Sequence, residues 1–153
     1  MGTKGNGERS TICGEGCAMT SLSMVLASLH IPQPYNNSLI NPGIFNQWLE
    51  FNKGYECIDG DCNNLILNIV SQLNNTVQLI GELSPPSIST IEQGIDSGLI
   101  AFLAHVHNRS HFVLLTDYTI PGSGNFTVND PYYNTTYYLY SDISDILMYA
   151  LLE

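Results

Sequence analysis

The sequence predicts an α+β protein, with helices in the first part of the chain and an antiparallel sheet in the second. In the first part, apolar residues recur at spacings of three and four, which is the period of an amphipathic helix. From residue 99 onward, β-branched and aromatic runs alternate with clusters of Gly, Pro, Asn and Ser, which is typical of consecutive antiparallel strands. Because such layers bury their apolar faces against each other, we expect the opening helix to lie on the sheet.

The helical period predicts three helices in the first half, over residues 17–30, 41–53 and 61–73. Pro32 follows the first helix, Pro42 suits the first turn of the second, and Asn74 terminates the third. A short strand and a capped helix come next, at residues 77–80 and 84–98. Four further strands are expected at residues 99–106, 111–119, 125–129 and 136–140. A last helix is expected after them, at residues 142–152.

The length and composition suit one globular core, since 44% of the 153 residues are hydrophobic. We therefore expect a single domain over residues 1–153, in which the polar, Gly-rich residues 1–10 form a flexible or trimmed start. The longest apolar runs fall far short of the roughly 18 to 20 residues that span a bilayer, so membrane insertion is not expected. Nothing in the sequence indicates an oligomeric state.

The charge is strongly negative, with fourteen acidic and four basic residues and a formal value of −10. Such a charge disfavours contact with phosphate backbones, so nucleic acid is not an expected partner. An acidic surface suits a secreted or a vesicular, lysosome-like location, and five Asn-x-Ser/Thr sequons favour glycosylation. A chain rich in Asn and Thr also produces sequons by chance, and both explanations stay open. The sequons begin at Asn36, Asn74, Asn108, Asn125 and Asn134.

Cys17 stands at the predicted start of the first helix, where unpaired backbone N–H groups and the positive end of the helix dipole favour an anion. Such a position lowers the pKa of a thiol, and the thiolate is the nucleophile in covalent acyl transfer. Gly14 and Gly16 would let a substrate backbone approach closely, and the Cys17 amide would supply one oxyanion donor. The alternative is a small buried cysteine or half of a disulfide.

His111 and Asp130 are the candidate partners of this thiol. His111 opens an apolar strand, and Asp130 ends the next strand, before Pro131 breaks the ladder. If these strands form a hairpin, pairing of Asp130 with Val113 puts Asp130 on the same face as His111. A register shifted by one residue sends the two to opposite faces. A structural histidine and a turn-forming aspartate are the alternatives.

The other histidines offer less chemistry. His105 and His107 alternate on one strand face, a spacing that suits a metal, but no further ligands are spaced to complete a zinc site. We therefore expect no metal and no other cofactor. His30 is interpreted as a helix-end residue.

Four cysteines allow three disulfide connectivities. Cys57 and Cys62 flank a short polar turn and would close on each other in an oxidising compartment, while Cys13 is an equally formal partner for either. Pairing of Cys13 with one of them would leave Cys17 free, which is the state that a nucleophile needs.

Four segments follow one another in a distinctive order: Cys17-Ala-Met-Thr-Ser-Leu-Ser-Met-Val-Leu, Asn41-Pro-Gly-Ile-Phe-Asn-Gln-Trp-Leu, His111-Phe-Val-Leu-Leu and Val128-Asn-Asp-Pro. Together they resemble the bacteriocin-processing-peptidase-like (double-glycine peptidase) branch of the papain-like cysteine peptidases. This resemblance spans nearly the whole chain. It implies a papain-like fold and an activity on a peptide or protein substrate. It also implies that Cys17 is the nucleophile, His111 the base and acid, and Asp130 the residue that orients the imidazole.

The resemblance also selects among the cysteines and exposes one departure. Cys17 is preferred over Cys13, because the family's nucleophile lies seven residues before the helix Met, here Met24. Family members commonly carry a Gln about six residues before the nucleophile to complete the oxyanion hole. That position is Thr11 here, and Ser10 lies beside it.

The candidate oxyanion and groove residues are therefore Ser10, Thr11 and Gly16. A hydroxyl or another side chain substitutes for the missing Gln, or catalysis is weak, since one lost oxyanion donor costs on the order of a hundredfold in rate.

Three functions fit these residues. The first is a thiol hydrolase that cleaves a peptide or related amide bond through an acyl-enzyme on Cys17. The second is a weak or inactive papain-like module that binds a peptide or protein partner, which Thr11 favours. The third keeps the nucleophile but acts as a cell-wall amidase or acyl transferase.

Overall fold

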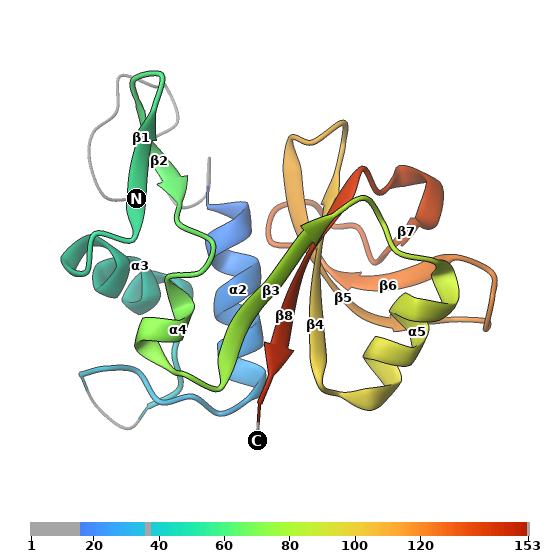
Figure 1. The fold of residues 1–153 in the computed structure, drawn as a ribbon, viewed down its shortest axis with the longest axis horizontal. Coiled ribbons are helices and arrows are strands. Elements are labelled where there is room, and N and C mark those ends of the chain that lie inside the picture. Colours follow the sequence, from blue (N-terminus) through green and yellow to red (C-terminus); the bar gives the residue numbers. More distant parts are fainter. Residues whose placement is uncertain (1–15, 36–37, 153) are drawn as a thin grey trace.

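The structure, a computed structural model, describes residues 16–35 and 38–152, and its elements form two neighbouring groups (Figure 1). One group holds three helices and a small hairpin, and the other holds a six-stranded sheet with one more helix. The first group consists of α2 (Cys17–Ser28), α3 (Pro42–Phe51), β1 (Tyr55–Ile58), β2 (Asp61–Leu65) and α4 (Val70–Leu73).

The sheet is antiparallel throughout, with the strand order β3-β8-β4-β5-β6-β7. Strands β4 to β7 form the expected meander, and β8 returns between β3 and β4. The predicted α+β class, with N-terminal helices packed on an antiparallel sheet, is therefore confirmed. The elements of this group are β3 (Val77–Leu83), α5 (Ile88–Ser97), β4 (Ile100–Val106), β5 (His111–Tyr118), β6 (Asn125–Asn129), β7 (Tyr137–Leu139), the 3-10 turn η1 (Tyr140–Asp142) and β8 (Asp145–Leu151).

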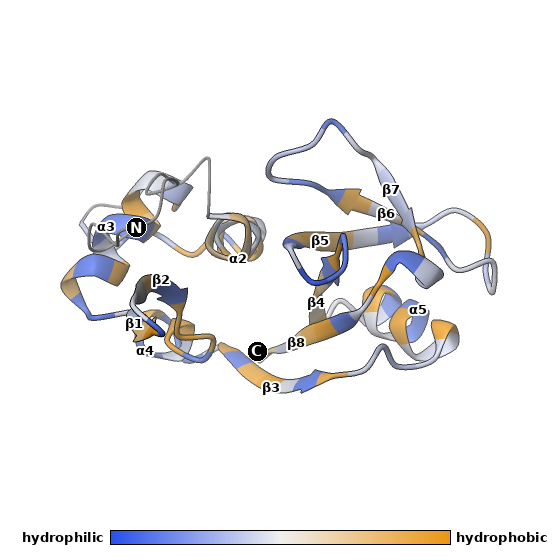
Figure 2. Ribbon diagram, turned by 90° about the horizontal axis from the view of Figure 1, so that it is seen from above, coloured by the Kyte–Doolittle hydropathy of each residue, from blue (hydrophilic) through white to orange (hydrophobic). Residues whose placement is uncertain are grey.

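Two apolar clusters cover the opposite faces of this sheet. The first joins the buried side of α2 to Leu103, Leu114 and Tyr149, and the second joins Ile91 of α5 to Phe102 and other residues of the second face. Figure 2 shows hydrophobic segments of β5 and β8 between α2 and α5. The opening helix thus lies on the sheet, as predicted, and its first turn comes next to the start of β5.

Side-chain caps explain where α3 and α5 begin. The side-chain oxygen of Asn41 accepts a hydrogen bond of 3.1 Å from a backbone N–H in the first turn of α3, and Pro42 occupies the first helical position, as predicted. Ser87 caps α5 in the same way, at 3.2 Å. Helix α5 ends where Gly98 adopts a left-handed φ of 65°.

The helix predicted over residues 61–73 is wrong in its first part. That part forms β2, which pairs with β1, and only α4 is helical. Asp59 and Gly60 between the two strands have φ values of 51° and 87°, so the chain reverses there instead of starting a helix. The apolar period arises because Ile69 and Val70 are buried in the cluster under α2.

The helix predicted over residues 142–152 is also wrong, because this segment forms β8. Strand β8 lies between β3 and β4, and the two apolar clusters cover both of its faces. Ile146 belongs to the cluster on the α5 side, whereas Leu147 and Tyr149 belong to the cluster under α2. A strand that is buried on both faces has no polar alternation, which makes its sequence similar to that of a buried helix.

The other predicted elements are present, with shifts of a few residues at their ends, and β1 was not predicted. Residues 1–10, for which a flexible start is expected, lie outside the described residues. None of the helices in the described ranges is long and apolar enough to cross a membrane.

Candidate active site

Cys17 is the first residue of α2 and is partly buried. Burial raises the pKa of its thiol, but the side-chain hydrogen bond with His111 and the backbone N–H groups of Phe112 and Ala18 outweigh burial and lower the pKa overall. The Ala18 N–H belongs to the first helical turn, and the Phe112 N–H comes from β5. The thiol therefore receives donors from both groups of elements, and these donors favour the thiolate.

His111 is the first residue of β5 and is 5% exposed. Its Nε2 lies 2.7 Å from Oδ1 of Asp130. Because Asp130 occupies Nε2, the Nδ1 atom is the nitrogen left for the hydrogen bond with Cys17. Burial lowers the pKa of His111, but the hydrogen bonds with Cys17 and Asp130 prevail and raise it.

Asp130 follows the last residue of β6, and its side chain is fully buried. Besides His111, its Oδ1 accepts hydrogen bonds from the backbone N–H groups of Tyr132 at 2.9 Å and Tyr133 at 2.8 Å. Its Oδ2 accepts a hydrogen bond of 3.0 Å from the Tyr138 hydroxyl. Burial raises the pKa of Asp130, but these donors lower it overall, so the carboxylate is held ionised against His111.

The register of the β5–β6 hairpin brings His111 and Asp130 to one face. Leu114 pairs with Asn129, so the next position of the ladder sets Val113 opposite Asp130. This is the register that the predicted contact between His111 and Asp130 requires. This register depends on a bulge, because Leu115 pairs with Val128 whereas Asp117 pairs with Thr127, and Thr116 is the extra residue.

A cavity of about 480 Å³ lies beside the thiol. It is lined by the start of α2, the β1–β2 hairpin, the segment after β2 and the sheet, and it is open to solvent on one side. Most of its lining is apolar, and such a cavity accommodates apolar groups of a ligand next to a nucleophile. Its lining includes Gly16, Cys17, Met19, Tyr55, Leu65 and Phe112.

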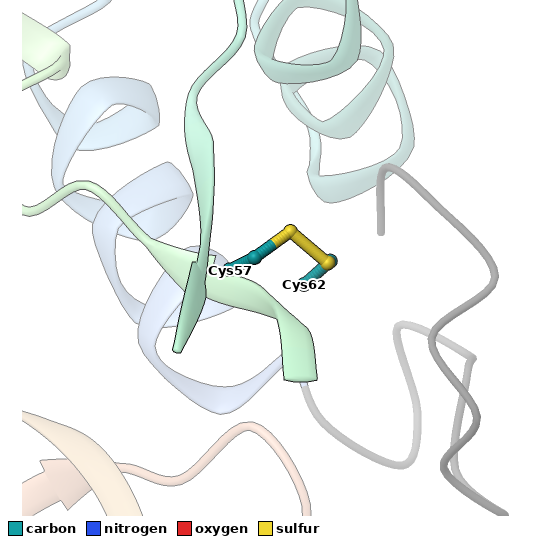
Figure 3. Close-up of a disulfide and its surroundings, with 2 residues drawn as sticks. All are labelled: Cys57 and Cys62. Carbon is teal, nitrogen blue, oxygen red and sulfur yellow. A yellow bond between two sulfur atoms is a disulfide. The ribbon is translucent and has the colours of Figure 1, made fainter. Parts of the chain in front are cut away.

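A disulfide joins Cys57 to Cys62 across the β1–β2 hairpin (Figure 3). The pairing of these two candidates is thereby confirmed. The third candidate, Cys13, lies outside the described residues. Among the described cysteines, Cys17 is the free thiol.

The candidate groove residues are described only in part. Gly16 is buried, precedes Cys17 at the start of α2 and lines the cavity. Thr11 and Ser10 lie outside the described residues, so their predicted contribution to the oxyanion hole stays a prediction.

The thiol has His111 as its hydrogen-bond partner and not one of the remaining histidines, although the His107 ring meets the His111 ring edge-on at a centroid distance of 5.8 Å. His30 follows the end of α2 with a left-handed φ of 55°, as expected of a helix-end residue. Nδ1 of His105 lies 3.1 Å from Oδ1 of Asp145, and its ring stacks on Phe112. His107 lies beyond the end of β4, so the predicted two-histidine strand face does not form. No group of three metal-ligating side chains was found among the described residues.

The sequence alone did not single out the tyrosines that surround Asp130. Tyr132 and Tyr133 follow Asp130 after Pro131 and contact the His111 ring edge-on, with centroid distances of 6.5 Å and 5.1 Å. Tyr138 reaches the carboxylate from β7. The run Asp-Pro-Tyr-Tyr after a strand was the sequence signal for tyrosines near Asp130. It does not show that Tyr138, farther along the chain, turns inward to the carboxylate.

These contacts define a papain-like α+β arrangement, in which a thiol at a helix N-terminus faces a histidine at the start of a sheet strand. The model of the Peptidase C39 like family matches residues 4–147, and the chain therefore belongs to this family. The resemblance to bacteriocin-processing, papain-like cysteine peptidases is thus confirmed. A search of curated proteins and a search of solved structures each found no match.

Proposed function

We propose that the protein is a thiol hydrolase that cleaves a peptide bond through an acyl-enzyme on Cys17, with His111 as base and acid and Asp130 as the orienting residue. One observation carries this proposal above all. The thiol of Cys17, the ring of His111 and the carboxylate of Asp130 form a continuous line of hydrogen bonds beside a largely apolar cavity.

The first half of the reaction forms a thioester. The Cys17 thiolate attacks the carbonyl carbon of the scissile bond, and the carbonyl electrons move to the oxygen. The N–H of Cys17 lies in the first helical turn, where it has no helical acceptor, and donates to this oxyanion. When the C–N bond breaks, the His111 imidazolium gives its proton to the leaving nitrogen.

The second half restores the enzyme. Water attacks the thioester while His111 takes its proton, the C–S bond breaks, and Cys17 leaves as a thiolate. Asp130 holds the His111 ring in one orientation throughout, since its Oδ1 also accepts two backbone N–H groups that fix the carboxylate. An apolar side chain of the substrate occupies the cavity while its backbone crosses Cys17.

A secreted or vesicular location is part of this proposal. The Cys57–Cys62 disulfide suits an oxidising compartment. Of the sequons, Asn108 is exposed in the turn between β4 and β5 and is an accessible acceptor for a glycan, whereas Oδ1 of Asn125 is buried.

The test has two parts, labelling and turnover. Iodoacetamide labelling, with the modified cysteine located by mass spectrometry, should be fast at Cys17 below about pH 7, and His111→Gln should slow it. A mixture of synthetic peptides should then be cleaved by the parent protein and left intact by Cys17→Ala, with matching circular dichroism spectra as the control. A poised thiol that cleaves no peptide bond would contradict the peptidase assignment, and undiminished cleavage by Cys17→Ala would contradict the role of Cys17.

A further inference from the structure

A second line of hydrogen bonds reaches Asp130 at Oδ2, the carboxylate oxygen that does not contact His111. The Tyr138 hydroxyl donates to Oδ2 of Asp130 at 3.0 Å, and Nε2 of His107 lies 3.0 Å from the same hydroxyl. Tyr138 comes from β7 and is 7% exposed, whereas His107 lies in the turn between β4 and β5 and is exposed. The chain of contacts therefore runs from the surface to the carboxylate that faces His111.

The direction of the hydrogen bonds in this chain follows from donor and acceptor counts. Burial and the neighbouring Asp130 raise the pKa of Tyr138 to about 12, so the hydroxyl keeps its proton. An ionised carboxylate only accepts, so the single hydroxyl hydrogen points to Asp130. The Tyr138 oxygen then accepts from Nε2–H of His107 and from the side chain of Thr135, whose hydrogen bond lowers the pKa of Tyr138.

The His107 ring is held by more than this one hydrogen bond. It stacks on Tyr133 at a centroid distance of 5.0 Å and an interplanar angle of 18°, and it meets Tyr138 edge-on at 5.6 Å. The backbone of His107 is left-handed, with a φ of 53°, and so is that of the two residues that follow it. Such a turn is costly for non-glycine residues and sets the direction in which the His107 side chain leaves the backbone.

We propose that Tyr138 is a positioning residue of the site, which holds Asp130 in the orientation that supports His111, and that His107 sets the direction of the Tyr138 hydroxyl. This role rests on the proposed function of Cys17 and His111. Without the hydroxyl, Oδ2 of a fully buried carboxylate loses its side-chain donor, and the carboxylate gains freedom to turn away from His111. A less firmly held Asp130 supports the His111 imidazolium less, and the Cys17 thiolate then forms only at higher pH.

The test compares iodoacetamide labelling rates of Cys17 across pH in four single variants and one double variant. Tyr138→Phe and His107→Phe remove the hydroxyl and its outer donor. His107→Gln keeps an N–H donor at the outer position. Tyr137→Phe is the matched control, because Tyr137 is the neighbouring residue of β7 and is 55% exposed.

We expect Tyr138→Phe to raise the pH midpoint of labelling by about half a unit, which slows labelling about threefold below the midpoint. His107→Phe should shift the midpoint in the same direction and by less, while His107→Gln and Tyr137→Phe should keep the parent midpoint. Since His107 acts through the hydroxyl, the double variant His107→Phe/Tyr138→Phe should be no slower than Tyr138→Phe alone.

Two results would overturn the proposal. One is an unchanged midpoint in Tyr138→Phe, and the other is a lower midpoint, which would mean that the hydroxyl only withdraws charge from Asp130. If Tyr138→Phe does not fold, the two variants of exposed His107 decide the question, and equal midpoints for Phe and Gln would overturn it. Failure of the proposed function has a different signature, because the parent protein itself would then label only in the range of an ordinary thiol.

Discussion

Nε2 of His111 lies 2.7 Å from Oδ1 of Asp130 because β5 carries one more residue than β6 between the hairpin turn and the site. Near the turn, Tyr118 pairs with Phe126, a register that would set Asp130 opposite Leu114 and on the other face from His111. The extra residue, Thr116, moves the register by one and brings the two side chains together. A single bulge therefore decides whether the imidazole has a carboxylate partner.

The bulge predicts the effect of a one-residue deletion. Removing Thr116 should extend the register seen near the turn along the whole β5–β6 ladder and so separate Asp130 from His111. Labelling of Cys17 at neutral pH should then slow about tenfold, which corresponds to a rise of about one unit in the pKa of the thiol. Thr116→Ala keeps the residue count and is the control, since Thr116 is exposed. Full-speed labelling by a folded deletion variant would show that the bulge does not control the site.

The pH dependence of the thiol follows from two opposite shifts. The pKa of Cys17 is lowered and that of His111 is raised, and both shifts favour the thiolate–imidazolium pair over the neutral pair. Labelling should fall as the pH drops through the Cys17 value, because the thiolate is then protonated. In His111→Gln, the rise in labelling should move up towards the range of an ordinary thiol, whereas a profile that does not move would rule out the ion pair.

The charge of Asp130 and its hydrogen-bond acceptor can be separated. Asp130→Asn keeps an oxygen for Nε2–H of His111 and loses the charge, while Asp130→Ala loses both. We expect the labelling midpoint to rise by about one unit in Asp130→Ala and by less in Asp130→Asn, because opposite charges at this separation shift a pKa by about one unit or more. Equal shifts in the two variants would mean that only the charge of Asp130 matters.

The disulfide should stabilise the hairpin without setting the reactivity of the thiol. The variant Cys57→Ser/Cys62→Ser should lower the free energy of unfolding by about 2 kcal/mol, measured by urea denaturation. Its Cys17 labelling midpoint should stay at the parent value, since His111, Phe112 and Ala18 supply the donors. A shifted midpoint would instead assign the hairpin a part in activating Cys17.

The close contact between α5 and the sheet makes a further stability prediction. A Cβ on Gly94 would collide with the Phe102 ring. Alanine gains about 1 kcal/mol of helix propensity over glycine, but overpacking costs about 1 to 3 kcal/mol, so Gly94→Ala should lower the melting temperature. Gln93→Ala, at an exposed neighbouring position, should not lower it. An increased melting temperature for Gly94→Ala would show that Phe102 moves aside at little cost.

The predictable part of the molecule is the part in which local period and packing agree. The residues of α2 and α3 follow a helical period, and Pro32 and Gly54 lie a few residues beyond their ends. The strands β4 to β6 alternate between covered faces and are separated by turn residues. In β8 both faces are buried as well, but its run Ile-Leu-Met-Tyr-Ala-Leu is rich in Leu, Met and Ala, which favour a helix. The hairpin β1–β2 is formed by the turn at Asp59 and Gly60 and is joined by the disulfide. The helical spacing of the apolar residues that follow led to the prediction of a helix there.

The sequence predicts which residue types form the site and in which order they occur, but it does not predict how their side chains are arranged in space. A cysteine at a helix start, a histidine opening a strand and an aspartate closing the next strand are visible in the sequence. The bulge at Thr116 is not visible, because an exposed threonine in a strand is compatible with either parity. The inward turn of Tyr138, next to exposed Tyr137, depends on the pairing of β6 with β7 and on the position of Asp130.

The two halves of the site belong to segments that are almost a hundred residues apart in the chain, since Cys17 begins α2 and His111 begins β5. The thiol gains its histidine and its Phe112 N–H only when α2 is seated on the sheet, so a chain that is still being synthesised carries an ordinary cysteine. The lowered pKa of the thiol therefore develops at the last stage of folding, when the helix docks on the sheet strands.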